Sequence, residues 1–191
     1  MKRFFHLFHA YFPQISLGWW LAILAFCAAV FLISWLRTRR LGRSAAFAAL
    51  AGYAFFLLVM LAFARRTRGG QTTVYPPFYS YRKILEHSRG SFEWACLDIF
   101  NCLLFFPLGF LYMIWNDTGR NAIRHAVLRA TAVGFALSLL AETLQLLLHR
   151  GAFEFDDILH NTIGTFLGAL IGGVFSKISL RALFPGSRKE T

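Results

Sequence analysis

The sequence predicts an all-α fold: a small polytopic bundle of about five membrane-spanning helices, preceded by an interfacial helix at the N-terminus. Of the 191 residues, 57% are hydrophobic and only 15% are charged, and the mean hydropathy is +0.53, unlike a soluble domain. The apolar residues also gather in runs of about 20, the number that a helix needs to cross a bilayer core. These runs are too long and alternate too little for barrel strands.

Residues 1–16 are expected to form an interfacial amphipathic segment, with a helix over residues 2–12. The stretch MKRFFHLFHAYFPQIS combines basic and aromatic residues, which is typical of a helix that lies in the headgroup layer. An irregular tail is the alternative. Because no apolar core ends in a small-residue cleavage site, we do not expect removal as a signal peptide.

Five apolar runs follow this segment, and each is predicted to span the membrane. The third contains Asn101, the fourth contains Glu142 and Gln145, and the fifth contains His160 and Asn161 near its start. Lipid cannot hydrogen-bond to open backbone groups, so each run is expected to be helical. The predicted spans are residues 17–36, 45–64, 99–115, 130–148 and 158–176.

The runs divide the chain into parts. Residues 17–44 are an additional N-terminal transmembrane helix with a basic loop, residues 45–176 a helical membrane domain, and residues 177–191 a basic tail. The connection over residues 65–96 is the only long one, and Gly69, Gly70 and the Pro76, Pro77 pair exclude a continuous helix through its first half. Its aromatic residues predict that it lies back on the bundle or on the membrane surface.

The net charge of +11 indicates an anionic partner. Because the basic residues cluster between apolar runs, membrane lipids are the expected partners and nucleic acid is not. Basic clusters at residues 37–43, 120–129 and in the tail favour an N-terminus outside the cell. The cluster at residues 65–68 opposes that orientation. The cysteines lack the spacing of a metal site and are expected to be packing residues.

Polar residues of the fourth run share one helical face. The spacing of Ser138, Glu142, Gln145 and His149 is four, three and four residues, so they lie on one stripe of a helix. An ionisable side chain inside a span must face protein or water, and it is a candidate for function. For Glu142, the alternatives are a packing carboxylate and a group that binds a ligand, proton or partner.

The fifth run carries a rib of glycines behind Asn161. A spacing of three, four and four residues aligns these positions on one helical face, and small residues at such spacing let helix axes approach closely. In the third run, Pro107 removes a backbone donor and predicts a bend beyond Asn101. One amide or carboxylate from each of three helices is expected to converge. The residues of this structural pattern are Asn161, Gly164, Gly168, Gly172, Asn101, Pro107 and Gly109.

The connection between the fourth and fifth runs is short and charged. Arg150 precedes Glu154, Asp156 and Asp157. Either aspartate is suited to cap the fifth helix, because a carboxylate accepts hydrogen bonds from free N–H groups at the positive end of the helix dipole. The other is then available to pair with Arg150 or to bind a cationic group.

The sequence lacks the motifs of several enzyme classes. The sequence contains no GxSxG, HExxH, phosphate-binding loop or dinucleotide-binding GxGxxG. The six histidines lack metal-ligand spacing, and His149 and His160 are expected to be interfacial instead. We therefore expect no metal and no cofactor, and we assign no catalytic residue.

Two segments together resemble the VanZ-like family of membrane proteins, which is named for a teicoplanin-resistance protein. The segments are DIFNCLLFFPLGFL at residues 98–111 and SLLAETLQLLLHRGAFEFDDILHNTIGTFLGALIGG at residues 138–173, preceded by YPPFYSY at residues 75–81. Phe100 departs from the glycine often found there. The matching positions are Pro77, Phe78, Tyr81, Asn101, Pro107, Gly109, Glu142, Gln145, Arg150, Asp156, Asp157, Asn161, Gly164 and Gly168.

The resemblance implies a multi-pass protein of the bacterial cell membrane that is linked to glycopeptide or lipoglycopeptide tolerance. One hypothesis is a binding protein whose polar residues engage a lipid-linked cell-wall intermediate or a lipoglycopeptide. A second is a membrane enzyme or proton-coupled carrier with Glu142 as its titrating group. A third is a structural subunit that binds its partner through the glycine rib.

Overall fold

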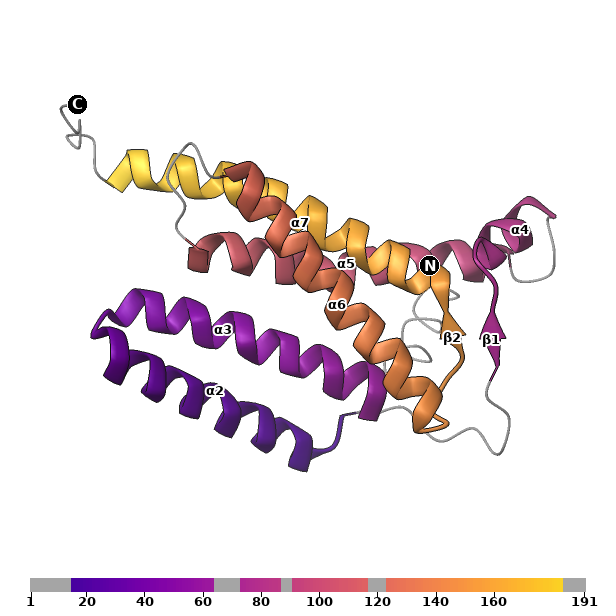
Figure 1. Ribbon diagram of the computed structural model, residues 1–191, viewed down its shortest axis with the longest axis horizontal. Helices are drawn as coiled ribbons and strands as arrows, with labels where there is room; N and C mark the ends of the chain where they lie inside the picture. The colour runs from indigo at the N-terminus through magenta and orange to yellow at the C-terminus, as the bar shows by residue number, and fades with distance from the viewer. Residues whose placement is uncertain (1–14, 64–72, 87–90, 117–122, 184–191) are drawn as a thin grey trace.

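The computed structural model describes residues 15–63, 73–86, 91–116 and 123–183, with side chains described as far as Phe175. These residues form six α-helices, a π-helical turn and two short strands (Figure 1). Five of the helices are long and apolar enough to cross a membrane, which confirms the predicted fold class. The interfacial helix expected at residues 2–12 lies outside the described residues.

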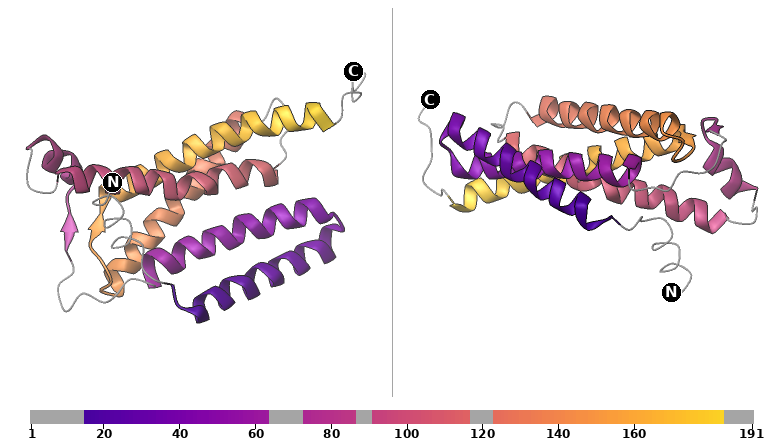
Figure 2. Two further views of the ribbon diagram at one scale, coloured as in Figure 1. Left: turned by 180° about the vertical axis from the view of Figure 1, so that it is seen from behind. Right: turned by 90° about the horizontal axis from the view of Figure 1, so that it is seen from below.

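The first two spans form a helical hairpin. Helix α2 (Leu17–Thr38) runs back along α3 (Leu41–Leu58), which continues into the π-helical turn η1 (Val59–Phe63) (Figures 1 and 2). Arg39 adopts a left-handed φ of 55° between them, and its N–H donates to the carbonyl of Trp35. Of the residues in α2, only Ile23 is buried. This helix therefore packs on α3 and leaves most of its apolar surface to lipid.

The other three long helices form the main bundle. They are α5 (Ser91–Asn116), α6 (Ile123–Leu147) and α7 (Phe155–Leu183). Each begins before its apolar run, α5 by eight residues at Ser91 compared with the predicted residue 99. Hydropathy marks only the part of a helix that lipid requires to be apolar, whereas backbone hydrogen bonding continues into the polar ends.

The glycine rib of α7 packs directly on the backbone of α5. A Cβ atom added to Gly164 would overlap the carbonyl oxygen of Cys102, and one added to Gly168 would overlap that of Phe106. A Cβ on Gly172 would lie 2.9 Å from the carbonyl oxygen of Phe110. These three carbonyls are spaced by four residues, so two matching helical faces are in close contact. Gly109 of α5 meets the backbone of α7 in the same way.

The described part of the long connection, residues 73–86, lies back on one end of the bundle, which is one of the two expected placements. Strand β1 (Val74–Tyr75) pairs in parallel with β2 (Phe153–Glu154), with Val74 opposite Phe153. A short helix, α4 (Tyr79–Leu85), follows β1 and lies beside the start of α5 (Figures 1 and 2). The connection thus brings α4 against the starts of α5 and α7, where the polar residues lie.

Candidate functional site at the polar end of the bundle

Buried polar side chains gather where α4, the starts of α5 and α7, and the end of α6 meet. We call this region the polar end. Most of its members are less than a tenth exposed, which is unusual for carboxylates and amides unless they are hydrogen-bonded. The buried members are Ser80, Asp98, Asn101, Ser138, Glu142, Gln145, Asp156, His160 and Asn161.

Asp156 accepts hydrogen bonds from the start of α4. Its Oδ1 accepts from the N–H of Phe78 at 2.6 Å, and its Oδ2 accepts from the N–H of Ser80 at 2.9 Å and from the Ser80 hydroxyl at 3.0 Å. Of the two aspartates suited to cap the fifth helix, Asp156 instead caps α4 with both of its carboxylate oxygens. Phe78 has a left-handed φ of 62°, a strained conformation for a non-glycine residue, and these bonds help to hold it. Pro77 sets the turn before it.

Asp157 joins α7 to α5. Its Oδ1 accepts from the amide of Asn101 at 2.6 Å. Asn101 is buried and Asp157 is half-buried, so this bond lies partly inside the protein. Two of the predicted site residues are thus in direct contact, across the face where the glycine rib brings the helices together.

Glu142 joins α6 to the β2 loop. Its Oε2 accepts from the N–H of Glu154 at 3.0 Å, and its Oε1 accepts from the Gln145 amide at 3.3 Å. The guanidinium of Arg150 donates to the carbonyl of Phe63, at the end of η1. The predicted residues of the connection therefore fasten it to η1 and α6.

Asn161 and Ser138 join α7 to α6. The Asn161 amide nitrogen donates to the Ser138 hydroxyl at 2.9 Å. The Asn161 Oδ1 atom is buried and has no hydrogen-bond partner within the described residues. A buried acceptor without a partner costs about 1–3 kcal/mol. This oxygen is therefore a position at which a ligand donor or a water molecule would stabilise the protein.

A second connected set joins Tyr81, a position of the family resemblance, to His160 and Asp98, which the sequence did not indicate as site residues. The Tyr81 hydroxyl lies 2.8 Å from His160 Nε2, and His160 Nδ1 lies 3.5 Å from Asp98 Oδ1. Burial raises the pKa of Tyr81, and the charges of Asp98, Asp156 and Cys102 raise it further. Its hydroxyl is therefore protonated near neutral pH. His160 is 6% exposed, so its ring lies inside the protein near the start of α7.

One sequence expectation needs adjustment, and one residue of the polar end was missed. His149 follows the end of α6 with a left-handed φ of 52° and is exposed, so it leaves the stripe that Ser138, Glu142 and Gln145 form. Asp98 was recognisable, because it lies one helical turn before Asn101 and is a carboxylate at the start of an apolar span. Its partners were not recognisable, since Tyr81 and His160 are far from it in sequence.

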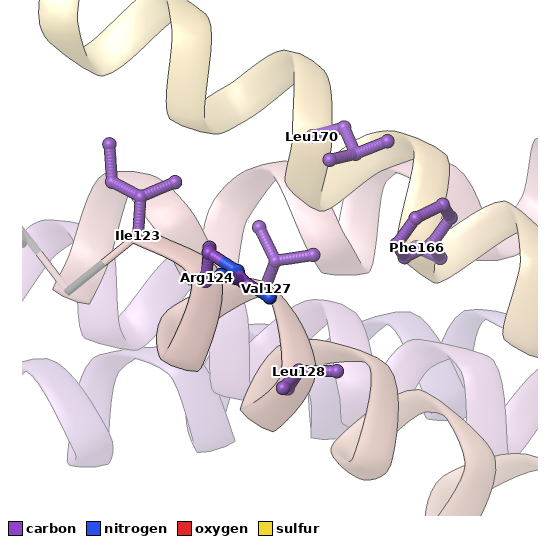
Figure 3. A pocket seen from close by; sticks show the side chains of 6 residues that line it. All are labelled: Ile123, Arg124, Val127, Leu128, Phe166 and Leu170. Carbon is purple, nitrogen blue, oxygen red and sulfur yellow. The ribbon is translucent and has the colours of Figure 1, made fainter. Parts of the chain in front are cut away.

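Metal ligation finds no support in the described side chains, since no three His, Cys, Asp or Glu groups are arranged to hold an ion. An apolar groove of about 230 Å³ lies near the start of α6, away from the polar end. Figure 3 shows Ile123, Val127 and Leu128 of α6 opposite Phe166 and Leu170 of α7, with Arg124 at the side. Because its lining is apolar and faces outward from two spans, lipid chains suffice to fill it.

Comparison with known proteins identifies one family. The VanZ/LLP1 family model matches residues 46–176, a range that contains α5, α6, α7 and the whole polar end. No curated protein and no solved structure matches the chain.

Proposed function

We propose, from the premise that this chain belongs to the VanZ/LLP1 family, that it binds the polar headgroup of a lipid-linked or lipophilic molecule at the polar end. The multi-pass membrane character of the chain provides access to such a molecule. The observation that carries the proposal is the Asn161 Oδ1 atom, which is buried without a hydrogen-bond partner among the described residues. A bound ligand that donates a hydrogen bond would remove this penalty.

The chemistry of the polar end favours a ligand that donates hydrogen bonds. Asn161 Oδ1 can only accept a hydrogen bond, and the carboxylate of Asp157, one helical turn before it, accepts from the Asn101 amide. A hydroxyl or an ammonium group complements these oxygens, whereas a second carboxylate would be repelled. Lipid-linked cell-wall intermediates and lipoglycopeptides both carry sugar hydroxyls and amines on an apolar anchor. A role in lipoglycopeptide tolerance, as in the protein for which the family is named, is the physiological form of this proposal.

The two other hypotheses receive less support. Both carboxylate oxygens of Glu142 already accept hydrogen bonds, one from Gln145 and one from Glu154. These bonds favour a structural role for Glu142 over a role as a proton carrier. The glycine rib contacts α5 within the same chain. A structural partner therefore cannot use that rib without separating α5 from α7.

Binding tests the proposal directly. Purified protein in lipid nanodiscs is titrated with an acylated lipoglycopeptide and with a glycopeptide that lacks the acyl chain. We expect the Asn161→Leu variant to bind the acylated compound about tenfold more weakly, because a lost buried hydrogen bond is worth about 1.4 kcal/mol. The matched control is Thr162→Val, which removes only a bond to the Ile158 carbonyl within α7. Equal affinity of Asn161→Leu and wild type would contradict the proposal.

The susceptibility of bacterial cells to a lipoglycopeptide provides the cellular test. A lipoglycopeptide-sensitive host expresses equal amounts of the wild type, Glu142→Gln, Asp157→Asn and Thr143→Ala. We expect the first two variants to lose protection and Thr143→Ala, which removes only an intrahelical bond on a more exposed part of α6, to keep it. Protection that is unchanged in both carboxylate variants would count against a role in tolerance.

A further inference from the structure

Tyr81, His160 and Asp98 are arranged in the order of a nucleophile, a base and an orienting group. The phenol oxygen is 2.8 Å from Nε2, and the opposite ring nitrogen is 3.5 Å from the carboxylate. Tyr81 is 37% exposed, whereas His160 is 6% exposed and Asp98 is 9% exposed. Only the phenol is placed to meet another molecule, and the two groups behind it are protected from water.

The contacts are compatible with one tautomer of the His160 ring. When the Tyr81 hydroxyl donates to Nε2, the proton on Nδ1 is directed towards the Asp98 carboxylate, which lies 3.5 Å away, too far for a hydrogen bond. A nucleophile within hydrogen-bond reach of a base that a third group orients is the general signature of nucleophilic catalysis. Since the pKa of Tyr81 is raised, the phenol does not ionise by itself at neutral pH and requires a base.

We propose that the chain cleaves an acyl ester of a membrane lipid, with Tyr81 as the nucleophile, His160 as the base and Asp98 as a positioning residue. Tyr81 Oη forms a bond to the ester carbonyl carbon while its proton moves to His160 Nε2. The bond from that carbon to the leaving alcohol breaks, and His160 returns the proton to the alcohol oxygen. A water molecule then forms a bond to the acyl-tyrosine carbonyl carbon while one of its protons moves to His160 Nε2. The bond from that carbon to Tyr81 Oη breaks, His160 returns the proton to the phenol oxygen, and a fatty acid is released.

The surroundings of Tyr81 select an uncharged ester. The charges of Asp98 and Asp156 act on the phenol and would repel an anionic phosphodiester more strongly than a neutral acyl ester. Phe78 packs against Tyr81 with ring centroids 6.0 Å apart, and it is 60% exposed. An exposed aromatic ring beside the nucleophile provides apolar surface for an acyl chain.

This inference does not rest on the binding function proposed above, because it uses none of the residues tested there. Loss of binding in Asn161→Leu leaves the Tyr81 series intact, and a failure of the Tyr81 series leaves Asn161 Oδ1 without a partner. Separate experiments therefore test the two proposals.

Covalent labelling tests the nucleophile without a known substrate. Full-length protein in liposomes is treated with hexadecylsulfonyl fluoride, and modified tyrosines are located by mass spectrometry. We expect Tyr81 to be labelled at least tenfold faster than Tyr75 and Tyr79, which stack on each other with centroids 4.4 Å apart. We expect His160→Gln to lower the rate at Tyr81 at least tenfold. Equal labelling of the three tyrosines, or a rate that His160→Gln leaves unchanged, would overturn the proposal.

Asp98 is tested by a spectroscopic readout. Nitrogen NMR of the His160 ring in liposomes is expected to show Nδ1 protonated in the wild type and a mixture of tautomers in Asp98→Asn. A ring that keeps one tautomer in Asp98→Asn would remove the positioning role. Melting temperatures of Asp98→Asn and Tyr81→Phe show whether each variant is folded, and Tyr81→Phe preserves the ring contacts with His160 and Phe78.

Turnover identifies the ester class. Liposomes that contain 4-nitrophenyl decanoate, and separately an alkyl 4-nitrophenyl phosphodiester of the same chain length, are mixed with wild type and Tyr81→Phe. We expect release of nitrophenol from the acyl ester and at least a tenfold loss in Tyr81→Phe. Release from the phosphodiester alone, or equal release by Tyr81→Phe, would overturn the assignment.

Discussion

Asp156 caps a helix to which it does not belong: its carboxylate accepts the N–H of Ser80, 76 positions away, at 2.9 Å. The same side chain accepts the N–H of Phe78. A seven-residue helix is too short to be stable alone. The position of α4, and with it that of Tyr81, therefore depends on the first turn of α7.

Replacing Asp156 with alanine should release α4. The change removes a cap, worth about 0.5–2 kcal/mol, and leaves the Ser80 hydroxyl without this partner. We expect faster hydrogen–deuterium exchange at residues 78–85 and little change within α6. The control is Asp157→Asn at the next position of α7, where the carboxylate accepts from the Asn101 amide of α5. Exchange at residues 78–85 that is equal in Asp156→Ala and wild type would show that other contacts hold the helix.

Gly168→Ala should separate α5 from α7. The added methyl group would overlap the Phe106 carbonyl, and backbone on two packed helices cannot move aside at low cost. We expect a loss of about 1–3 kcal/mol, measured as a lower melting temperature in detergent. The matched control is Gly42→Ala on α3, where a Cβ meets nothing within 4 Å and alanine favours the helix by up to about 1 kcal/mol. Equal melting of the two variants would contradict the close packing.

Alkaline pH should weaken the contact between Tyr81 and the rest of the polar end. The pKa of Tyr81 is raised above 10.0, first by burial and then by Asp98, Asp156 and Cys102, so the fold favours the neutral phenol. Stability from this group is complete below the unfolded value and is lost as pH rises through the folded value. We expect the melting temperature of the wild type to fall more steeply above about pH 10 than that of Tyr81→Phe. Parallel curves would contradict the raised pKa.

The sequence was sufficient for the spans and for the glycine rib. Lipid requires about 20 apolar residues for each crossing, and the spacing of Gly164, Gly168 and Gly172 determines a helical face regardless of the partner. Glu142 and Gln145 were predicted to face protein for the same reason. Helical periodicity describes one helix at a time, so it identifies which residues share a face of that helix.

The partners of these residues could not be read from the sequence. Asp156 was suited to the start of its own helix, yet it binds Phe78 and Ser80 because the parallel pairing of β1 and β2 brings the long connection to α7. His160 lacked a recognisable partner for the same reason. Hydrogen bonds between distant segments depend on how the connection folds back, and single-sequence patterns do not encode that path.

Labelling from each side of the membrane should place the polar end outside the cell. The arrangement of the helices puts every acidic side chain that the structure describes at the polar end, whereas Arg37, Arg39, Arg40 and Arg43 lie at the turn between α2 and α3 at the other end (Figure 1). Basic residues in short loops remain on the cytoplasmic side. In a background with Cys27, Cys96 and Cys102 replaced by alanine, we expect a membrane-impermeant maleimide to label Glu86→Cys in intact cells. It should label Gly42→Cys only after permeabilisation, since Gly42 is exposed near the basic turn. The reverse pattern would place the polar end in the cytoplasm and would leave Arg37 to Arg43 as an exception to the charge rule.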